Sequence, residues 1–464
     1  RTSRVKRRVR GERRVKQLEF LSACSALSVF NLVFSEAINQ MKHFIILIVL
    51  FASTAALAEK TSIVTYPRWR GEHANASVTS GDYPVHLTDA KNLAWKIELP
   101  GKGCSSPVVW GDMIVVTTPV ENEDALMAFN FQGKEQWRVS VGKARGGKHR
   151  NGSAANPSPT TDGRHIFAYF KSGNLAAVDF KGKVAWSTNL QDRFGKDTLY
   201  WDLGTSPVLT KKHVIVAVMH AGDSYLAAFD KASGELAWKA DRNYECPVEG
   251  DQSYATPIII DHKGREAILV WGAERLTAHD AADGKIIWSC AGFNPKQKRN
   301  WVVVASHLVV DDMVIVPYGR GSHITGVKLG GEGDVTETHR LWTRDDSSAF
   351  VPTPAGYDGK VVVVGDRGKV TCLDAKTGDI KWSGALAKAA ASYYSSPMVA
   401  GDKLYATRAD GVIFVATLDG HLKVLSENDM GERIIATPVP VANRLLLRGE
   451  KHLFCIVEHK ATSE

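Results

Sequence analysis

The chain has 464 residues, of which 44% are hydrophobic and 23% charged, and its formal net charge is +8 at pH 7. This length exceeds that of an average domain, although some all-β folds fill it as one compact unit. The charge is concentrated at the N-terminus: residues 1–40 carry nine Lys or Arg against three Asp or Glu, and with Lys42 removed as well about +1 remains for residues 59–464. Overall basicity therefore gives no support to a nucleic-acid partner, and none is predicted.

Residues 41–58 have the features of a secretory signal peptide. Met41-Lys42 is a short basic start, an apolar run begins at Phe44, and Ala56-Leu-Ala58 is a small-x-small cleavage site. The apolar run is short for a membrane span, and the residue after Ala58 is Glu59 rather than the Cys of a lipoprotein. We expect cleavage after Ala58, a bacterial protein of the periplasm or the exterior, and no stable membrane anchor after cleavage.

A short motif then returns roughly every 45–50 residues. It consists of a small residue, an Asp or Asn two positions later, a Gly, and a Trp four residues after the Gly; Ala177, Asp179, Gly182 and Trp186 form one copy. A period of this size indicates a repeat architecture.

A second motif recurs with the same period: a Ser/Thr-Pro dipeptide at the start of short β-prone strands. These dipeptides are Ser106-Pro107, Ser158-Pro159, Ser206-Pro207, Thr256-Pro257, Thr353-Pro354, Ser396-Pro397 and Thr437-Pro438, and Ser306-His307 takes the same place in one unit. Eight starts predict eight units. Each unit reads as four short strands separated by turn residues, which is the composition of an antiparallel propeller blade.

The residue types of the motif have physical reasons. Gly182 and its equivalents lie in the last hairpin turn, where a positive φ is needed and Gly supplies it without steric cost. Neighbouring blades pack face to face at the small residue, and the Trp fills the wedge between them. Cofactor stacking is the alternative role for such Trp side chains. We interpret the following set as structural: Trp95, Trp137, Trp186, Trp238, Trp288, Trp342 and Trp382.

The ring must also close. The last unit ends near Val457 without a Trp-ended strand, whereas residues 92–99 form such a strand with no unit before it. We therefore predict an all-β fold, an eight-bladed β-propeller of four-stranded antiparallel blades in which this N-terminal strand completes the last blade. The fifth unit is stretched over residues 326–342 and should carry a longer outer hairpin.

The expected division of the chain follows from these elements. It consists of a non-native or disordered basic extension (1–40), the signal peptide (41–58), an N-terminal segment (59–91), the propeller (92–460) and a tail (461–464).

Five cysteines follow the signal peptide. Cys372 and Cys455 occupy the small-residue position and are interpreted as buried. Cys104, Cys246 and Cys290 lie near blade junctions, and two of them could pair in an oxidising compartment. The spacing of the cysteines matches neither a zinc site nor a haem-attachment motif.

The Ala-x-Asp…Gly-x-x-x-Trp repeats with their Ser-Pro-Val strand starts resemble the propeller repeat of the pyrroloquinoline-quinone (PQQ) type. The opening Trp69-Arg-Gly-Glu-His-Ala-Asn75 and the stretch from Leu93 to Asp112 are similar to secreted bacterial proteins of that superfamily. The resemblance covers roughly residues 67–458. It implies the fold, but this one fold hosts both quinone enzymes and non-catalytic scaffolds.

Two functions are compatible with the resemblance. A quinoprotein dehydrogenase oxidising an alcohol or sugar would hold PQQ with Ca²⁺ on the propeller axis, through carboxylate and amide oxygens. Many such enzymes have a disulfide between adjacent cysteines, and this chain has no Cys-Cys pair. Four acidic loop residues could serve as metal ligands: Asp202, Glu245, Glu249 and Asp251. Acidic side chains that are simply solvated on loops are the commoner explanation.

The second function is a non-catalytic scaffold, similar to the PQQ-like propeller subunit of the outer-membrane protein assembly machinery. We favour this hypothesis and assign no catalytic residue, metal or cofactor. The dehydrogenase with PQQ and calcium remains the alternative.

Loops that lead from a Trp-ended strand to the next Ser/Thr-Pro strand all emerge on one rim around the axis, and binding groups concentrate on such loops. Exposed Trp, Tyr and Arg in one patch are typical of a binding hot spot; ordinary packing of loops over the channel mouth is the alternative. We expect a monomer that binds a protein, glycan or small ligand at this rim. The candidate residues are Arg150, Asn151, Trp201, Asp202, Asp251, Tyr254, Arg299, Asn300, Trp301, Tyr393, Tyr394 and Arg433.

Overall fold

The computed structural model describes residues 63–88 and 90–458. The predicted extension and signal peptide, and the tail 461–464, lie outside the described residues. From Val64 onward the chain forms one compact unit. In the part of the chain that is described, no helix is long and apolar enough to cross a membrane.

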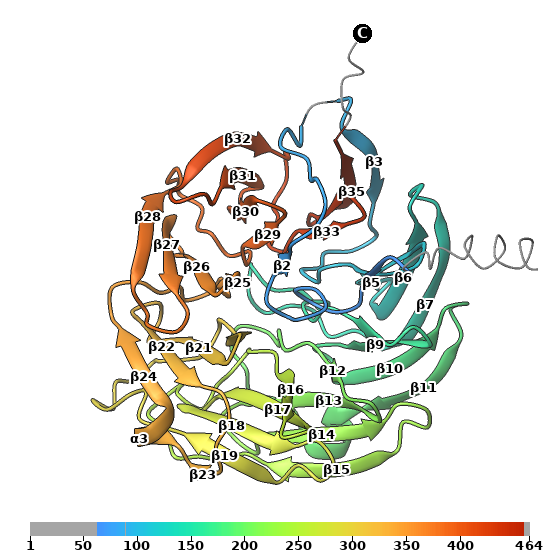
Figure 1. Ribbon diagram of the computed structural model, residues 1–464. Helices are drawn as coiled ribbons and strands as arrows, with labels where there is room; N and C mark the ends of the chain where they lie inside the picture. The colour runs from blue at the N-terminus through green and yellow to red at the C-terminus, as the bar shows by residue number, and fades with distance from the viewer. Residues whose placement is uncertain (1–62, 89, 459–464) are drawn as a thin grey trace, which may run out of the picture. The chain divides into compact units, whose positions relative to one another are not determined.

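Eight antiparallel blades follow one another around a ring, as the eight strand starts predict (Figure 1). Blade 1 contains β4 (Val108–Trp110), β5 (Met113–Val120), β6 (Glu123–Asn130) and β7 (Glu135–Lys143). Blade 2 contains β8 (Thr160–Thr161), β9 (His165–Tyr169), β10 (Asn174–Asp179) and β11 (Val184–Asn189). Blade 3 contains β12 (Val208–Leu209), β13 (His213–Val218), β14 (Tyr225–Asp230) and β15 (Leu236–Asp241). Blade 4 contains β16 (Ile258–His262), β17 (Arg265–Gly272), β18 (Arg275–Asp280) and β19 (Ile286–Cys290).

The second half of the ring repeats this order. Blade 5 contains β20 (Leu308–Val310), β21 (Met313–Tyr318), β22 (His323–Lys328) and β24 (Arg340–Arg344). Blade 6 contains β25 (Ala355–Tyr357), β26 (Lys360–Val364), β27 (Lys369–Asp374) and β28 (Ile380–Ala385). Blade 7 contains β29 (Met398–Ala400), β30 (Lys403–Thr407), β31 (Val412–Thr417) and β32 (Lys423–Asp429).

Blade 8 closes the ring as predicted. It combines β33 (Val439–Val441), β34 (Arg444–Arg448) and β35 (His452–Val457) with the N-terminal strand β3 (Leu93–Glu98). Strand β3 pairs antiparallel with β35, with Trp95 opposite Cys455. The two ends of the propeller are therefore held in one sheet, which leaves no blade with a missing outer strand.

Five of the eight joints between blades have a common construction, whereas the buried Trp288 indole N–H has no hydrogen-bond partner among the described residues. The indole Nε1 of the outer-strand Trp donates to a backbone carbonyl of the next blade, as in Trp137 to Phe180 (3.0 Å) and Trp186 to Lys231 (2.9 Å). The next blade's hairpin Gly packs against the same ring: a Cβ on Gly182 would lie 2.9 Å from the Trp137 indole, and Gly182 has a φ of +82°. Gly182 is therefore needed for two reasons: its turn has a positive φ, and the Trp of the preceding blade leaves no room for a Cβ atom.

The fifth unit carries the longer hairpin that its sequence predicts. Between β22 and β24 lie β23 (Gly333–Asp334) and the short helix α3 (Thr336–His339). Strand β23 pairs in parallel with β19, so the insertion reaches back to blade 4. A second short helix, α2 (Leu190–Phe194), follows β11 and is capped by the Asn189 side chain, which accepts from the backbone N–H groups of Gln191 and Asp192.

The N-terminal segment crosses the propeller axis. Strand β1 (Thr65–Tyr66) pairs with β4 of blade 1, and β2 (Ser77–Val78) pairs in parallel with β29 of blade 7. Between them the chain bonds to further blades: the Pro67 carbonyl accepts from Thr161 of blade 2, and the Trp69 indole donates to Thr437 at the start of blade 8. In Figure 1 this blue segment passes across the centre of the ring. The axial channel is therefore plugged from one side.

All five cysteines among the described residues are free thiols. Cys372 and Cys455 are fully buried, as their position in the repeat predicts. No disulfide joins Cys104, Cys246 or Cys290, so the pairing that the sequence left open does not occur here.

Candidate functional site

A cavity of about 810 Å³ opens along the axis on the side opposite the N-terminal plug. Trp69 of the plug lines it, together with residues from the loops between every pair of successive blades. Because the connections from outer to inner strands all emerge at this end of the ring, the site is a funnel whose wall consists of one loop per joint.

A ring of side-chain hydroxyls builds the inner wall of the funnel. The backbone N–H of six strand-start residues donates to the side-chain hydroxyl of the equivalent residue in the next blade. This contact joins Ser106 to Ser158 (2.9 Å), Ser158 to Ser206 (3.0 Å), Ser206 to Thr256 (3.1 Å), Thr256 to Ser306 (3.0 Å), Ser306 to Thr353 (2.8 Å) and Thr353 to Ser396 (3.0 Å). The fifth unit keeps its Ser while His307 replaces the Pro, because the hydroxyl makes the link and the Pro does not.

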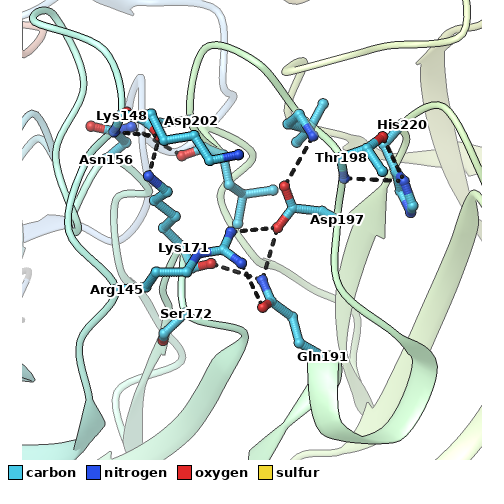
Figure 2. Close-up of polar contacts among 12 residues, drawn as sticks. Arg145, Lys148, Asn156, Lys171, Ser172, Gln191, Asp197, Thr198, Asp202 and His220 are labelled. Carbon is cyan, nitrogen blue, oxygen red and sulfur yellow. Dashed lines mark hydrogen bonds and ion pairs between the residues drawn. The ribbon is translucent and has the colours of Figure 1, made fainter.

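The rim loops of blades 1 to 3 are fixed by the charged network shown in Figure 2. The Asp202 carboxylate is buried; it pairs with the buried Lys171 ammonium and accepts from the backbone N–H groups of Lys148 and His149. Beside it, Arg145 pairs with Asp197 at 2.7 Å, and the Gln191 amide hydrogen-bonds to both. These contacts hold the loop that carries His149 against the loop that carries Trp201.

Six of the twelve candidate binding residues line the funnel. They are Arg150, Asn151, Trp201, Asp202, Tyr254 and Tyr394. Trp201 packs edge-on against His149, with ring centroids 4.6 Å apart, and its backbone N–H donates to the Tyr254 hydroxyl.

The other six candidates lie outside the funnel lining. They are Asp251, Arg299, Asn300, Trp301, Tyr393 and Arg433. Trp301 packs against Tyr318 and His323, and Tyr393 is buried with its hydroxyl on the Ala387 carbonyl. Arg433 donates to the Asn151 side chain from behind the wall (2.7 Å). Arg299 is exposed on the rim.

Several funnel residues come from turns that lie outside the connecting loops predicted to form the binding rim. Arg320 lies in the turn between β21 and β22, and Asp366, Arg367 and Lys369 lie in or beside the turn between β26 and β27. These turns reach the funnel because they emerge at the same end of the blades as the connecting loops. The only sequence feature of these turns is a charged residue beside Gly, as in Gly319-Arg320-Gly321 and Arg367-Gly368. Ordinary exposed turns share this pattern, so it does not predict a position in the funnel.

The funnel has more positive than negative charge. Its cations are Arg150, Arg320, Arg367 and Lys369, and its two carboxylates are Asp202 and Asp366. Asp202 is neutralised by Lys171, and Asp366 accepts from the backbone N–H groups of Phe350 (2.8 Å) and Val351 (3.2 Å). Burial raises the pKa of the Asp366 carboxyl.

Not all of the cations have partners. Arg320 lies 3.5 Å from the Glu249 carboxylate, and Lys369 donates to the Asp346 carbonyl (2.7 Å). Across residues 63–88 and 90–458, Arg150 and Arg367 form no ion pair within 4.0 Å. Two exposed guanidinium groups at the funnel therefore remain available to a bound anion.

The residues present do not fit a calcium site of the quinoprotein kind. Among the residues described, no three His, Cys, Asp or Glu side chains come together as a metal-binding group. Of the loop acids that could serve a metal, Asp202 is paired with Lys171, Glu249 lies against Arg320, and Glu245 and Asp251 do not line the funnel. Calcium needs several free oxygen ligands around one point.

Comparison with known proteins identifies the family. The family model described as outer membrane protein assembly factor BamB matches residues 72–195, 123–357 and 334–423. The chain belongs to this family. The resemblance to the PQQ-like propeller repeat is thereby confirmed, together with the eight-bladed fold.

Curated relatives within this family share modest identity with the chain. BamB of Yersinia pestis is 23% identical over 321 residues, covering 67% of this chain and 74% of the relative. BamB of Moranella endobia (strain PCIT) is 23% identical over 295 residues, covering 62% of this chain and 67% of the relative.

Solved structures share the fold. BamB from Moraxella catarrhalis has a TM-score of 0.59 at 16% identity, covering 79% of this chain and 99% of that one. A quinohemoprotein alcohol dehydrogenase from Comamonas testosteroni also has a TM-score of 0.59, at 11% identity, covering 86% of this chain and 82% of that one. At these identities the likeness concerns the fold alone, since enzymes and assembly factors both share it.

Proposed function

We propose that this protein is a non-catalytic scaffold of the periplasm or the cell exterior that binds a protein partner at the rim of the axial funnel. The observation that carries the proposal is the funnel itself, whose rim brings exposed aromatic and cationic side chains together on loops held by buried contacts. The relatives named as outer membrane protein assembly factors support it. A protein that assists assembly acts through contacts with other proteins.

The rim has the composition of a binding surface. Tyr200 is 61% exposed and Val248 is 53% exposed, both on rim loops. Tyr200 also packs edge-on against Trp201, with ring centroids 4.9 Å apart. Large aromatic side chains held rigidly lose little conformational freedom on binding and so supply much of the affinity at interfaces.

The groups inside the funnel are already used by the fold, which favours binding over chemistry. Most of the strand-start hydroxyls accept hydrogen bonds from the neighbouring blade, and both carboxylates hold loops in place. A general base needs an accessible acceptor aimed at its substrate.

Affinity capture with matched variants tests the proposal. The full chain is immobilised and exposed to a periplasmic extract, and retained proteins are identified by mass spectrometry. We expect a defined partner that is retained by the wild type and lost from Tyr200→Ala/Trp201→Ala. The control is Leu341→Ala/Ile380→Ala, which removes two exposed apolar side chains from the outer strands β24 and β28, outside the funnel lining. A partner lost from the control and kept by the rim variant would overturn the proposal.

A further inference from the structure

The geometry points to a specific ligand chemistry for the funnel: we infer that it receives an acidic, extended peptide segment of the partner. This inference rests on the proposed function and deepens it, because it names what the partner must present. Three features of the funnel carry it, namely the unpaired cations, the uncompensated charges buried behind its wall, and its depth.

The first feature is the pair of free guanidinium groups. Arg150 comes from the loop between blades 1 and 2, and Arg367 from the inner turn of blade 6. They belong to well-separated blades of the ring, and neither forms an ion pair with a described residue. Arginine presents a planar fork of donors that matches a carboxylate, so each can bind one acidic side chain.

The second feature is buried positive charge without a counterion. Arg448 is 1% exposed and donates to Ser105 and to the Thr117 carbonyl, next to Cys104 of the funnel wall. Arg70, also 1% exposed, follows the Trp69 floor and donates to the Pro354 carbonyl. Neither pairs with a carboxylate of the described chain. Charges in a low-dielectric wall are poorly screened, so both favour an anion in the funnel.

Burial disfavours the charged form of the Arg448 and Arg70 guanidinium groups without neutralising them at pH 7. It lowers the pKa of Arg448 to about 10 and that of Arg70 to about 9, so both remain charged at neutral pH.

The third feature is shape. The funnel is closed below by Trp69 and has a volume of about 810 Å³, which is the size of a cavity that engulfs a small ligand. A flat protein surface cannot enter such a space, whereas a chain segment with its side chains can. The strand-start hydroxyls and the Asn151 and Asn156 side chains line its wall, and Tyr394 and Phe350 add apolar contact.

Fluorescence anisotropy of a labelled hexa-aspartate peptide tests the inference on the full chain. Hexaserine and hexalysine peptides of the same length serve as ligand controls. We expect saturable binding of hexa-aspartate alone, weakened by rising salt because surface charge interactions are screened. In Arg150→Glu/Arg367→Glu the affinity should fall about tenfold or more, since each tenfold step corresponds to the loss of about one good charge contact.

The control protein is Arg164→Glu/Arg265→Glu, which makes the same charge change with two exposed arginines outside the funnel lining. It should bind hexa-aspartate within about twofold of the wild type, a difference that corresponds to a small fraction of one charge contact. Urea unfolding of both variants establishes that they are folded. Arg150→Gln/Arg367→Gln provides a second funnel variant that removes the charges without reversing them.

Three results would overturn the inference. The first is equal weakening in the funnel and control variants, which would mean that only net charge matters. The second is absence of hexa-aspartate binding. The third is full displacement of the peptide by phosphate at equal charge concentration, which would make the funnel a small-anion site. If rim-dependent capture of a partner persists in any of these cases, the proposed function stands and only the acidic segment is wrong.

Discussion

At five of the joints between blades the same contact recurs: an indole N–H donates to the next blade's backbone, and that blade's Gly lies against the indole ring. At the axial rim the loops differ from one another. The loop between blades 2 and 3 is held by the buried Lys171–Asp202 pair and by the Tyr254 hydroxyl, which accepts from the Trp201 backbone N–H. The loop between blades 5 and 6 is held by Asp366, which accepts from two backbone N–H groups of that loop. The contacts that join the blades therefore repeat from blade to blade, whereas the contacts that hold the rim loops, where we propose that the partner binds, differ from loop to loop.

The hydroxyl ring shows that position alone does not separate the two regions. Ser206, Thr256 and Ser306 line the funnel, yet each makes the same contact as its neighbours. By this criterion they belong with the joints, although they lie at the axis.

The largest loss of stability is expected at Asp202, which lies at the rim but whose buried contacts hold the fold together. Asp202→Ala would leave the Lys171 ammonium buried without its counterion, at a cost of about 3–5 kcal/mol in the free energy of unfolding. Urea denaturation measures this cost. Lys171→Met/Asp202→Leu, which removes both charges, should be less destabilised than the single variant. A loss below about 1 kcal/mol in Asp202→Ala, typical of surface pairs, would contradict the assignment.

The next effect separates two tryptophans. Trp186→Ala removes a joint and should cost about 2–4 kcal/mol, because a large, partly buried side chain and its hydrogen bond are lost. Trp201→Ala should cost less, about 1–2 kcal/mol, because Trp201 packs against the same hydrophobic core as Trp186 but no hydrogen bond from its indole to another described blade is lost. In the capture experiment, Trp201→Ala should lose the partner, and Trp186→Ala should retain it as long as this variant is folded. Equal losses of stability in the two variants would remove the distinction between joint and rim.

A smaller effect depends on pH. Asp124 is fully buried against Ser172 and Asn174 of blade 2, and burial raises the pKa of its carboxyl to about 6. Since the ordinary value is about 4, the folded state holds this proton more tightly than the unfolded chain. The cost of burying the charged carboxylate is absent below about pH 4 and develops as the pH rises through about 6.

The stability of Asp124→Asn relative to the wild type should therefore increase by about 2 kcal/mol between pH 4 and pH 7. Chemical denaturation of both proteins at several pH values provides the comparison, and Asp162→Asn is the matched control, because the pKa of that carboxyl is lowered. A pH-independent difference between wild type and Asp124→Asn would show that this carboxyl titrates as in the unfolded chain.

The sequence predicted the repeated part of the molecule well. Eight strand starts gave eight blades, the Trp95 strand closes the last blade, and the stretch around Gly326 to Trp342 forms a longer hairpin. These features were predictable because one physical requirement, packing a blade against its neighbour, recurs and so leaves a period in the chain.

The unrepeated part was predicted less well. Arg320 and Arg367 reach the funnel from turns whose residues look like those of any exposed hairpin. The plug around Trp69 belongs to no unit, so no register placed it on the axis. Asp202 is a candidate predicted from the sequence, and it lines the funnel. Its partner Lys171 lies in a turn of blade 2, 31 residues earlier, and no local sequence pattern predicts that the two residues pair.

Site-specific photocrosslinking in intact cells tests the central claim most directly. A photoreactive amino acid is introduced at Tyr200 on the rim or at Leu341 on an outer strand; both side chains are exposed, at 61% and 50%. The account predicts a protein adduct from position 200 and none from position 341. Adducts from position 341 alone would contradict it and move the binding surface to the outer edge of the blades.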